Sequence, residues 1–228
     1  MDTFKQEIVF LAILISFFSI TSQAQNDFTG YFEPSVEVSY YVSPKYSHSF
    51  GIENRNYIYR RNDLAYNVKQ IDISHFSEYQ WHPQYAVGLG LQYRLENAFE
   101  NDEENEFRIQ EQFVYTPRTL GFKVSHRFRA EQRLYASLGK HRFRYLLGYQ
   151  FPLANENMFQ PYIKVSTESL LELAKTQKPE FEQRLEVSFG WMLDAKTTLQ
   201  LGVEYQLADY VQDLNHELFL NAELEIIL

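Results

Sequence analysis

Two alternating segments follow each other in residues 181–207, which read FEQRLEVSFGWMLDAKTTLQLGVEYQL. Side chains on a β-strand project alternately to opposite faces, so each segment has one apolar and one polar face. The apolar positions of the first segment are Phe181, Leu185, Val187, Phe189, Trp191 and Leu193, and those of the second are Leu199, Leu201, Val203, Tyr205 and Leu207. Because Asp194 to Thr197 form a short polar turn between them, the pattern predicts an antiparallel hairpin with two unlike faces.

Similar strand-like segments fill the rest of the chain after residue 25, without a convincing helical period. The expected strands are 28–42, 46–58, 64–80, 85–96, 106–115, 119–131, 140–151, 159–169, 181–193, 198–207 and 216–228. Short turns alternate along the chain with longer polar connections, as they do in outer-membrane barrels. Single-chain bacterial barrels have an even number of strands. We therefore expect twelve strands if Pro34 divides the first segment, or ten if one segment is not a strand.

Aromatic side chains recur beside the same set of connections. They are Tyr40, Tyr41, Tyr46, Tyr79, Trp81, Tyr85, Phe113, Tyr115, Phe122, Tyr149, Phe151, Phe159, Phe189 and Trp191. Such rings form a girdle at a membrane interface, whereas a soluble core has no reason to sort them to one end. The predicted fold class is therefore all-β: a closed antiparallel up-and-down outer-membrane β-barrel of about 10 to 12 strands. A soluble sandwich or lipocalin-like barrel is the alternative.

The first 24 residues have the pattern of an export signal. An apolar run from Ile8 to Ile20 is too short to span a membrane, and Ser22-Gln23-Ala24 ends it with small residues. We expect a signal peptide at 1–24, one barrel domain at 25–228, and a location in the bacterial outer membrane. The chain has no cysteine, so it has neither disulfides nor a lipoprotein attachment residue. Its net charge of -9 argues against nucleic acid as a partner, because phosphate binding needs a basic surface.

One stretch carries a resemblance to a known family. It consists of His126 to Arg133 (HRFRAEQR), then Arg142 to Tyr145 (RFRY), and then Pro152-Leu153. The chain resembles an uncharacterised family of exported barrels of Bacteroidota-type bacteria, catalogued as domain of unknown function 2490. The likeness spans nearly the whole chain after the signal and implies an outer-membrane barrel without an assigned activity. The chain departs from the usual outer-membrane ending, because its last residue is Leu228 and not Phe.

Charges on the polar face form the candidate functional site. Counting outward from the centre of each predicted hairpin places Arg94 opposite Arg108, Arg108 opposite Arg127, and Arg127 opposite Arg144. The predicted basic belt of the lumen is Arg94, Arg108, Arg127, Arg129, Arg142 and Arg144, with Arg129 and Arg142 paired beside the others. Like charges on facing positions need counter-ions. The expected acidic wall across the lumen is Glu33, Glu37, Glu182, Glu186, Glu204 and Glu223.

Two interpretations of these charges stay open. Narrow barrels fill their interior with side chains, which favours a plug of salt bridges. Arginine also grips phosphate or carboxylate with two parallel bonds, which would make the belt an anion-binding eyelet.

Two polar residues interrupt the apolar, lipid-facing series. Glu111 and His126 are expected as diagonal neighbours across one hairpin, where they could orient each other for hydrolysis of an acyl ester. Alternatively, a bulge near Gln110 to Gln112 turns Glu111 inward.

No cofactor, metal or nucleophile motif is present in the sequence. We therefore predict a small, non-enzymatic outer-membrane barrel that acts as a narrow pore or as a surface or partner-binding scaffold. The alternative is a barrel enzyme that acts on lipid or lipopolysaccharide. The expected partners are outer-membrane lipid, lipopolysaccharide and, during biogenesis, the barrel-assembly machinery.

Overall fold

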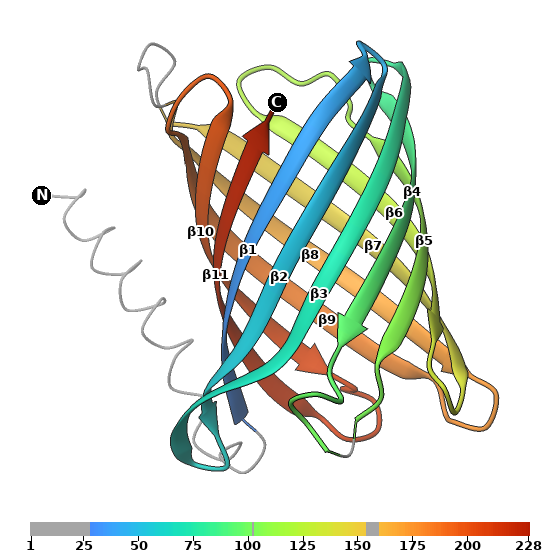
Figure 1. Cartoon of the computed structure of the whole chain (residues 1–228). Helices are drawn as coiled ribbons and strands as arrows, with labels where there is room; N and C mark the ends of the chain where they lie inside the picture. Colours follow the sequence, from blue (N-terminus) through green and yellow to red (C-terminus); the bar gives the residue numbers. More distant parts are fainter. Residues whose placement is uncertain (1–27, 102, 154–159) are drawn as a thin grey trace, which may run out of the picture.

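Eleven strands form one closed barrel in the computed structural model, which describes residues 28–101, 103–153 and 160–228 (Figure 1). The strands are β1 (Phe28–Ser43), β2 (Tyr46–Arg60), β3 (Asp63–His82), β4 (Tyr85–Leu95), β5 (Glu106–Tyr115), β6 (Lys123–Leu134), β7 (Gly139–Pro152), β8 (Tyr162–Ala174), β9 (Glu180–Met192), β10 (Thr197–Ala208) and β11 (Asn215–Ile227). The predicted fold class is confirmed. Over the described residues, no helix is long and apolar enough to cross a membrane. The predicted signal peptide at 1–24 and the start at Gln25 lie outside the described residues.

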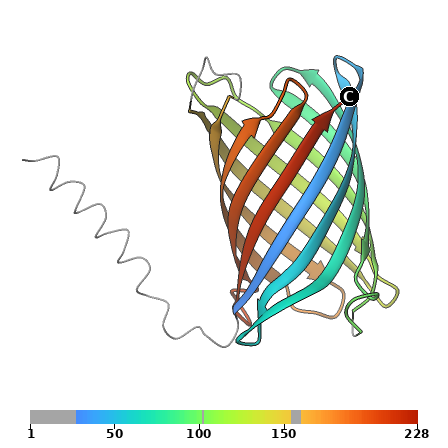
Figure 2. The same ribbon diagram turned by 60° about the vertical axis from the view of Figure 1, so that its left-hand side comes forward.

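The barrel closes through a parallel pair of strands. β1 and β11 run side by side in the same direction (Figures 1 and 2), with a continuous register from Phe28↔His216 to Ser39↔Ile227. All other neighbouring pairs are antiparallel. The expectation of an even strand number was wrong, because an odd number of alternating strands leaves the first and last strands parallel. Pro34 does not divide β1, where it lies opposite Ala222.

Aromatic packing stabilises this seam from inside the barrel. Tyr31 and Phe219 face each other across the seam, and their rings stack with centroids 4.7 Å apart. Tyr57 of β2 packs against Tyr31 at 5.1 Å, and the Arg55 guanidinium lies 4.7 Å from the centre of the Phe219 ring. Phe219 is fully buried, and these three rings form the one buried apolar cluster of the described residues. Burial of large rings thus anchors the only parallel contact among the described strands.

The strand connections lie at two ends of the barrel. β11 ends at the carboxy-terminal end of the barrel, where the turn between β1 and β2 also lies. β1 begins at the opposite end, which we call the amino-terminal end (Figure 1). Arg61 and Asn62 make a two-residue turn at the amino-terminal end with φ of 55° and 63°, as a type I′ hairpin requires. At the carboxy-terminal end, the Lys196 N–H donates to Asp194 Oδ1 at 2.8 Å, which lowers the pKa of the Asp194 carboxyl.

Connection length is sorted less cleanly than predicted. The two-residue Arg61–Asn62 turn lies at the end that also carries the long connection between β4 and β5. Conversely, the long connection between β7 and β8 lies at the carboxy-terminal end with the short turns. Hairpin geometry sets each connection separately, so length alone does not identify the end.

The polarity of the barrel is inverted relative to a soluble domain. Outward-facing side chains are apolar and exposed around the wall, for example Leu89 at 53%, Val187 at 55% and Val203 at 47%. Inward-facing side chains are mostly polar and buried. At the carboxy-terminal end, rings stack along the outer wall, with centroids 5.9 Å apart for Trp81 and Tyr85 and 5.1 Å apart for Tyr85 and Tyr115. The barrel therefore has an apolar outer surface and a charged lumen.

Candidate functional site

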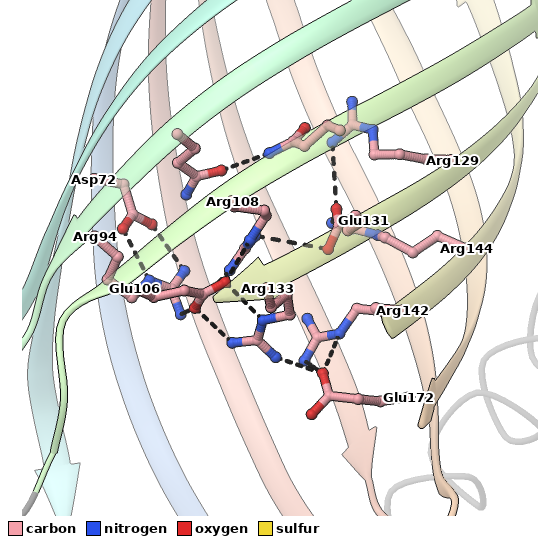
Figure 3. A network of polar contacts seen from close by, with 12 residues as sticks. Asp72, Arg94, Glu106, Arg108, Arg129, Glu131, Arg133, Arg142, Arg144 and Glu172 are labelled. Carbon is pink, nitrogen blue, oxygen red and sulfur yellow. Dashed lines mark hydrogen bonds and ion pairs between the residues drawn. The ribbon is translucent and has the colours of Figure 1, made fainter. Parts of the chain in front are cut away.

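A network of ion pairs occupies the lumen on β3 to β8 (Figure 3). The strand period of two brings charged side chains of one parity inward on each strand. Those drawn and labelled in Figure 3 are Asp72, Arg94, Glu106, Arg108, Arg129, Glu131, Arg133, Arg142, Arg144 and Glu172. Each labelled acid has an arginine nitrogen within 3.0 Å, so the network supplies its own counter-ions.

Glu106 is the centre of this network. Its carboxylate is 0% exposed and accepts from Arg108 Nε at 2.7 Å and Nη2 at 3.1 Å. Arg133 Nε and Nη2 each donate to it at 2.7 Å, and the Tyr135 hydroxyl donates at 3.0 Å. Arg94, directly opposite on β4, lies 3.9 Å away and makes a two-pronged pair with Asp72, at 2.8 Å for each contact. One carboxylate therefore ties β4, β5 and β6 together.

Three further carboxylates extend the network to β7 and β8. Glu172 accepts from Arg133 Nη1 at 2.5 Å, from Arg142 Nε at 2.7 Å and from Lys140 Nζ at 2.7 Å. Arg144 donates to Glu131 at 3.0 Å and to Glu168 at 2.5 Å. Charge-assisted bonds of this kind are the strongest side-chain hydrogen bonds in proteins. The network therefore links neighbouring strands through their side chains.

A second, smaller network lies on the opposite wall. Arg184 pairs with Glu182 at 2.5 Å and lies 3.8 Å from Glu204. Arg55 of β2 pairs with Glu33 of β1. These acids belong to the predicted acidic wall, but their partners are Arg55 and Arg184 and not the predicted basic belt.

The other members of the acidic wall contact neutral groups or a distant lysine. Glu186 accepts from Ser166 at 2.9 Å and lies 3.8 Å from Lys164. Gln200 donates to Glu223 at 3.0 Å, and Ser39 donates to Glu37 at 3.3 Å. The prediction of a basic half-wall that pairs with an acidic half-wall is therefore wrong.

The predicted register of the arginine belt is also wrong. Arg94 lies opposite Glu106, and Arg108 lies opposite Gln92 on β4 and Arg133 on β6. Arg127 lies opposite Val114 and Leu146, Arg129 lies opposite Arg144, and Arg142 lies opposite Glu131. The shift arises in the connections between β4 and β7, whose bends the sequence pattern does not show. It brings carboxylates beside guanidiniums that the prediction had placed against each other.

Sequence reasoning missed several central residues: Asp72, Glu106, Glu168, Glu172 and Arg133. Glu106, Glu168 and Glu172 share the inward parity of their strands, which was the available signal. The position of each side chain along the barrel axis determines its ion-pair partners, and that position depends on register and not on parity.

The predicted pair on the outer wall does not form. Glu111 faces outward and is exposed, and the ladder through β5 has no bulge. Glu111 lies opposite Ala130, whereas His126 lies opposite Tyr115, so four residues of ladder separate the two. The His126 ring contacts the Tyr145 hydroxyl at 2.9 Å. A joint catalytic role of Glu111 and His126 therefore has no geometric basis.

The lumen also contains cavities on either side of a polar layer. Gln110 donates to Gln92 at 2.7 Å, and Arg129 donates twice to the carbonyl oxygen of Gln112, at 2.6 and 3.1 Å. A cavity of about 400 Å³ lies towards the carboxy-terminal end, and one of about 390 Å³ lies within the charged networks. Both are lined by Gln92 and Arg129. Within the described ranges, no group of three or more His, Cys, Asp and Glu side chains is arranged to hold a metal ion.

Comparison with known proteins identifies the family. A family model described as a protein of unknown function, DUF2490, matches residues 34–216, and the chain belongs to this family, as the sequence resemblance predicted. No curated protein matches the chain. Among solved structures, the chain is similar to the siderophore receptor PirA from Pseudomonas aeruginosa, with 14% identity and a TM-score of 0.30. The match covers 77% of this chain and 33% of the receptor, so the chain spans about a third of that protein.

Proposed function

We propose that this member of the DUF2490 family spans the bacterial outer membrane as a non-enzymatic barrel with an occluded lumen, and that it serves as a scaffold for a partner at the membrane surface. The exposed apolar wall supports a membrane location, because soluble monomers rarely expose contiguous apolar surfaces this extensive. The stacked rings at the carboxy-terminal end suit a membrane interface. Outer-membrane lipid and lipopolysaccharide would then contact the outer wall, and the barrel-assembly machinery would insert it.

The ion-pair network around Glu106 is the observation that carries the occluded lumen. It connects β3 to β8 through side chains that are almost fully buried, including Glu106, Glu131 and Arg108 at 0%, 1% and 5% exposure. Narrow barrels fill much of their interior with side chains, whereas much wider porins keep an aqueous channel. Free passage of solutes through this network would require breaking several buried ion pairs.

A narrow pore is the second candidate function. The two cavities share Gln92 and Arg129 as lining residues, so the polar layer at Arg129 is the main division between them. Movement of that layer would join the cavities into a polar path.

Conductance in planar bilayers tests the proposal. We expect wild-type protein to give little or no conductance. Replacing Glu106, Arg108 and Arg133 together by serine removes the centre of the network without leaving a stranded charge at that position, and conductance should rise. Glu111→Gln on the outer wall is the control and should leave conductance unchanged. A stable, ion-selective open channel in wild-type protein would contradict the occluded lumen and favour the pore.

Location needs a separate measurement. Cells that express the full chain should yield the protein in the outer-membrane fraction, and sequencing of its amino terminus should begin at Gln25. Recovery from the soluble periplasmic fraction would refute a membrane barrel.

A further inference from the structure

The cavity towards the carboxy-terminal end has the lining of a ligand site. Its volume of about 400 Å³ lies within the range of small-molecule sites. Hydrogen-bonding side chains dominate the wall: Ser39, Ser47, Ser49, Ser74, Gln92, Gln110 and Gln112. Tyr41 and Ser47 also line it, next to the turn that joins β1 and β2, so the cavity extends to that end of the barrel.

One wall of this cavity presents two carboxylates that have no cationic partner among the described residues. Glu37 of β1 and Glu78 of β3 both line it. Glu37 accepts from the Ser39 hydroxyl at 3.3 Å. In the parts of the chain that the structure describes, neither Glu37 nor Glu78 has a Lys, Arg or His nitrogen within 4.0 Å. Glu37 thus contacts a neutral hydroxyl group and not a cation.

The other wall presents a guanidinium whose charge is poorly matched. Arg129 of β6 directs Nε and Nη2 to the single carbonyl oxygen of Gln112, which is a neutral acceptor. Its ion-pair contact in the described residues is Glu131 at 3.9 Å, and that carboxylate already accepts from Arg144 at 3.0 Å. Arg94, Arg108, Arg133, Arg142 and Arg144 each have a carboxylate within 3.0 Å.

Arg127 adds a second cation to the same wall. It shares Glu168 with Arg144, lying 3.0 Å from one oxygen of that carboxylate. Its side chain is 29% exposed, the most accessible of the arginines on β5 to β7. Arg127 and Arg129 therefore retain capacity for an anion that faces the cavity.

A fixed aromatic face completes the wall between the two sets of charges. The Phe76 ring lies against Gly88 and Gly90, where an added Cβ would come within 2.2 and 2.4 Å of ring atoms. Only glycine leaves room for the ring at these positions. The Arg129 guanidinium lies 5.8 Å from the ring centre, so Phe76 also helps to hold Arg129 in place.

We propose that this cavity binds a small zwitterion, an amino acid or short peptide in size, whose carboxylate pairs with Arg129 and Arg127 and whose ammonium group pairs with Glu37 and Glu78. Glu37 and Glu78 on one wall and Arg129 on the other face the same cavity, and no salt bridge joins them among the described residues. A ligand with both charges neutralises both sets at once, whereas a simple anion or cation leaves one set uncompensated. Binding at this cavity does not require a particular cellular location of the barrel.

Binding measurements on the purified protein in detergent test this assignment. The probes are ω-amino carboxylates from glycine to 6-aminohexanoate, measured by calorimetry, with hexanoate and hexylammonium as single-charge analogues. We expect at least one zwitterion to bind at least tenfold more tightly than either analogue. Because a hydrogen bond to a charged group contributes tenfold or more in affinity, Arg129→Gln and Glu37→Gln should each weaken binding at least tenfold.

Matched variants keep the test decisive. Lys164→Gln removes a lumen charge that does not line this cavity and should leave the affinity nearly unchanged. If Arg129→Gln does not fold, Glu37→Gln and Glu78→Gln carry the test, since neither removes an ion pair. Absence of binding by every zwitterion, equal binding of hexanoate, or equal affinity of Glu37→Gln and wild type would overturn the assignment.

Discussion

Removing the charge of Glu106 is expected to destabilise the barrel strongly. Glu106→Gln keeps the shape of the side chain but removes the anion that Arg108 and Arg133 both contact. Arg133 retains Glu172 at 2.5 Å, whereas in the described part of the chain Arg108 retains only Glu131, at 3.8 Å. One buried guanidinium is thus left without a close counter-ion. Removing one partner of a buried pair typically costs about 3–5 kcal/mol, and we expect a loss of that size in the free energy of unfolding.

The assay is reversible unfolding in urea in the presence of lipid bilayers, with two comparisons. Glu180→Gln is the control, because Glu180 is 42% exposed and lies 3.8 Å from Lys140. Pairs near the surface contribute about 0–1 kcal/mol, so little change is expected there. Adding Arg108→Gln to Glu106→Gln removes the stranded charge and should recover part of the lost stability. A loss below about 1 kcal/mol for Glu106→Gln, or a double variant less stable than Glu106→Gln, would refute the role of Glu106.

Two further predictions concern the wall and the ends of the barrel. Val203→Arg should cost about 2–4 kcal/mol in a bilayer refolding titration, because it places a charge on the apolar outer wall, whereas Glu204→Gln in the lumen should cost less; equal effects would mean that the two faces are assigned wrongly. The chain has no native cysteine, so single cysteines report topology directly. Ala195→Cys and Asp213→Cys lie at opposite ends, and a membrane-impermeant maleimide should label one of the two in intact cells; labelling of both would contradict a single membrane-spanning orientation.

The hairpin of β9 and β10 shows how much structure a local sequence pattern can predict. Its alternation and four-residue turn predicted an antiparallel hairpin with two unlike faces, and the structure places apolar residues opposite each other, Leu199 opposite Trp191 and Val203 opposite Val187. A short turn leaves little freedom of register, so the pattern on one strand specifies its partner on the next. The same reasoning identified all eleven strand segments and the polar character of the inward face.

The closing seam and the charge network could not be obtained in this way. Whether β1 meets β11 in parallel depends on strand count and barrel closure, which are properties of the whole chain. The partners of Glu106 depend on register across long connections, where a shift of two residues keeps the parity but exchanges a carboxylate for a guanidinium.

The sequence by itself therefore determined that this protein is an all-β barrel with a charged inside and an apolar outside, because strand periodicity is local. Only the tertiary structure decided which charges pair, because an ion pair requires two side chains to lie at the same level along the barrel axis and both to face the lumen. It also decided which charges stay unmatched. Glu37, Glu78 and Arg129 face one cavity because the barrel brings distant strands around it, and no local pattern contains that arrangement.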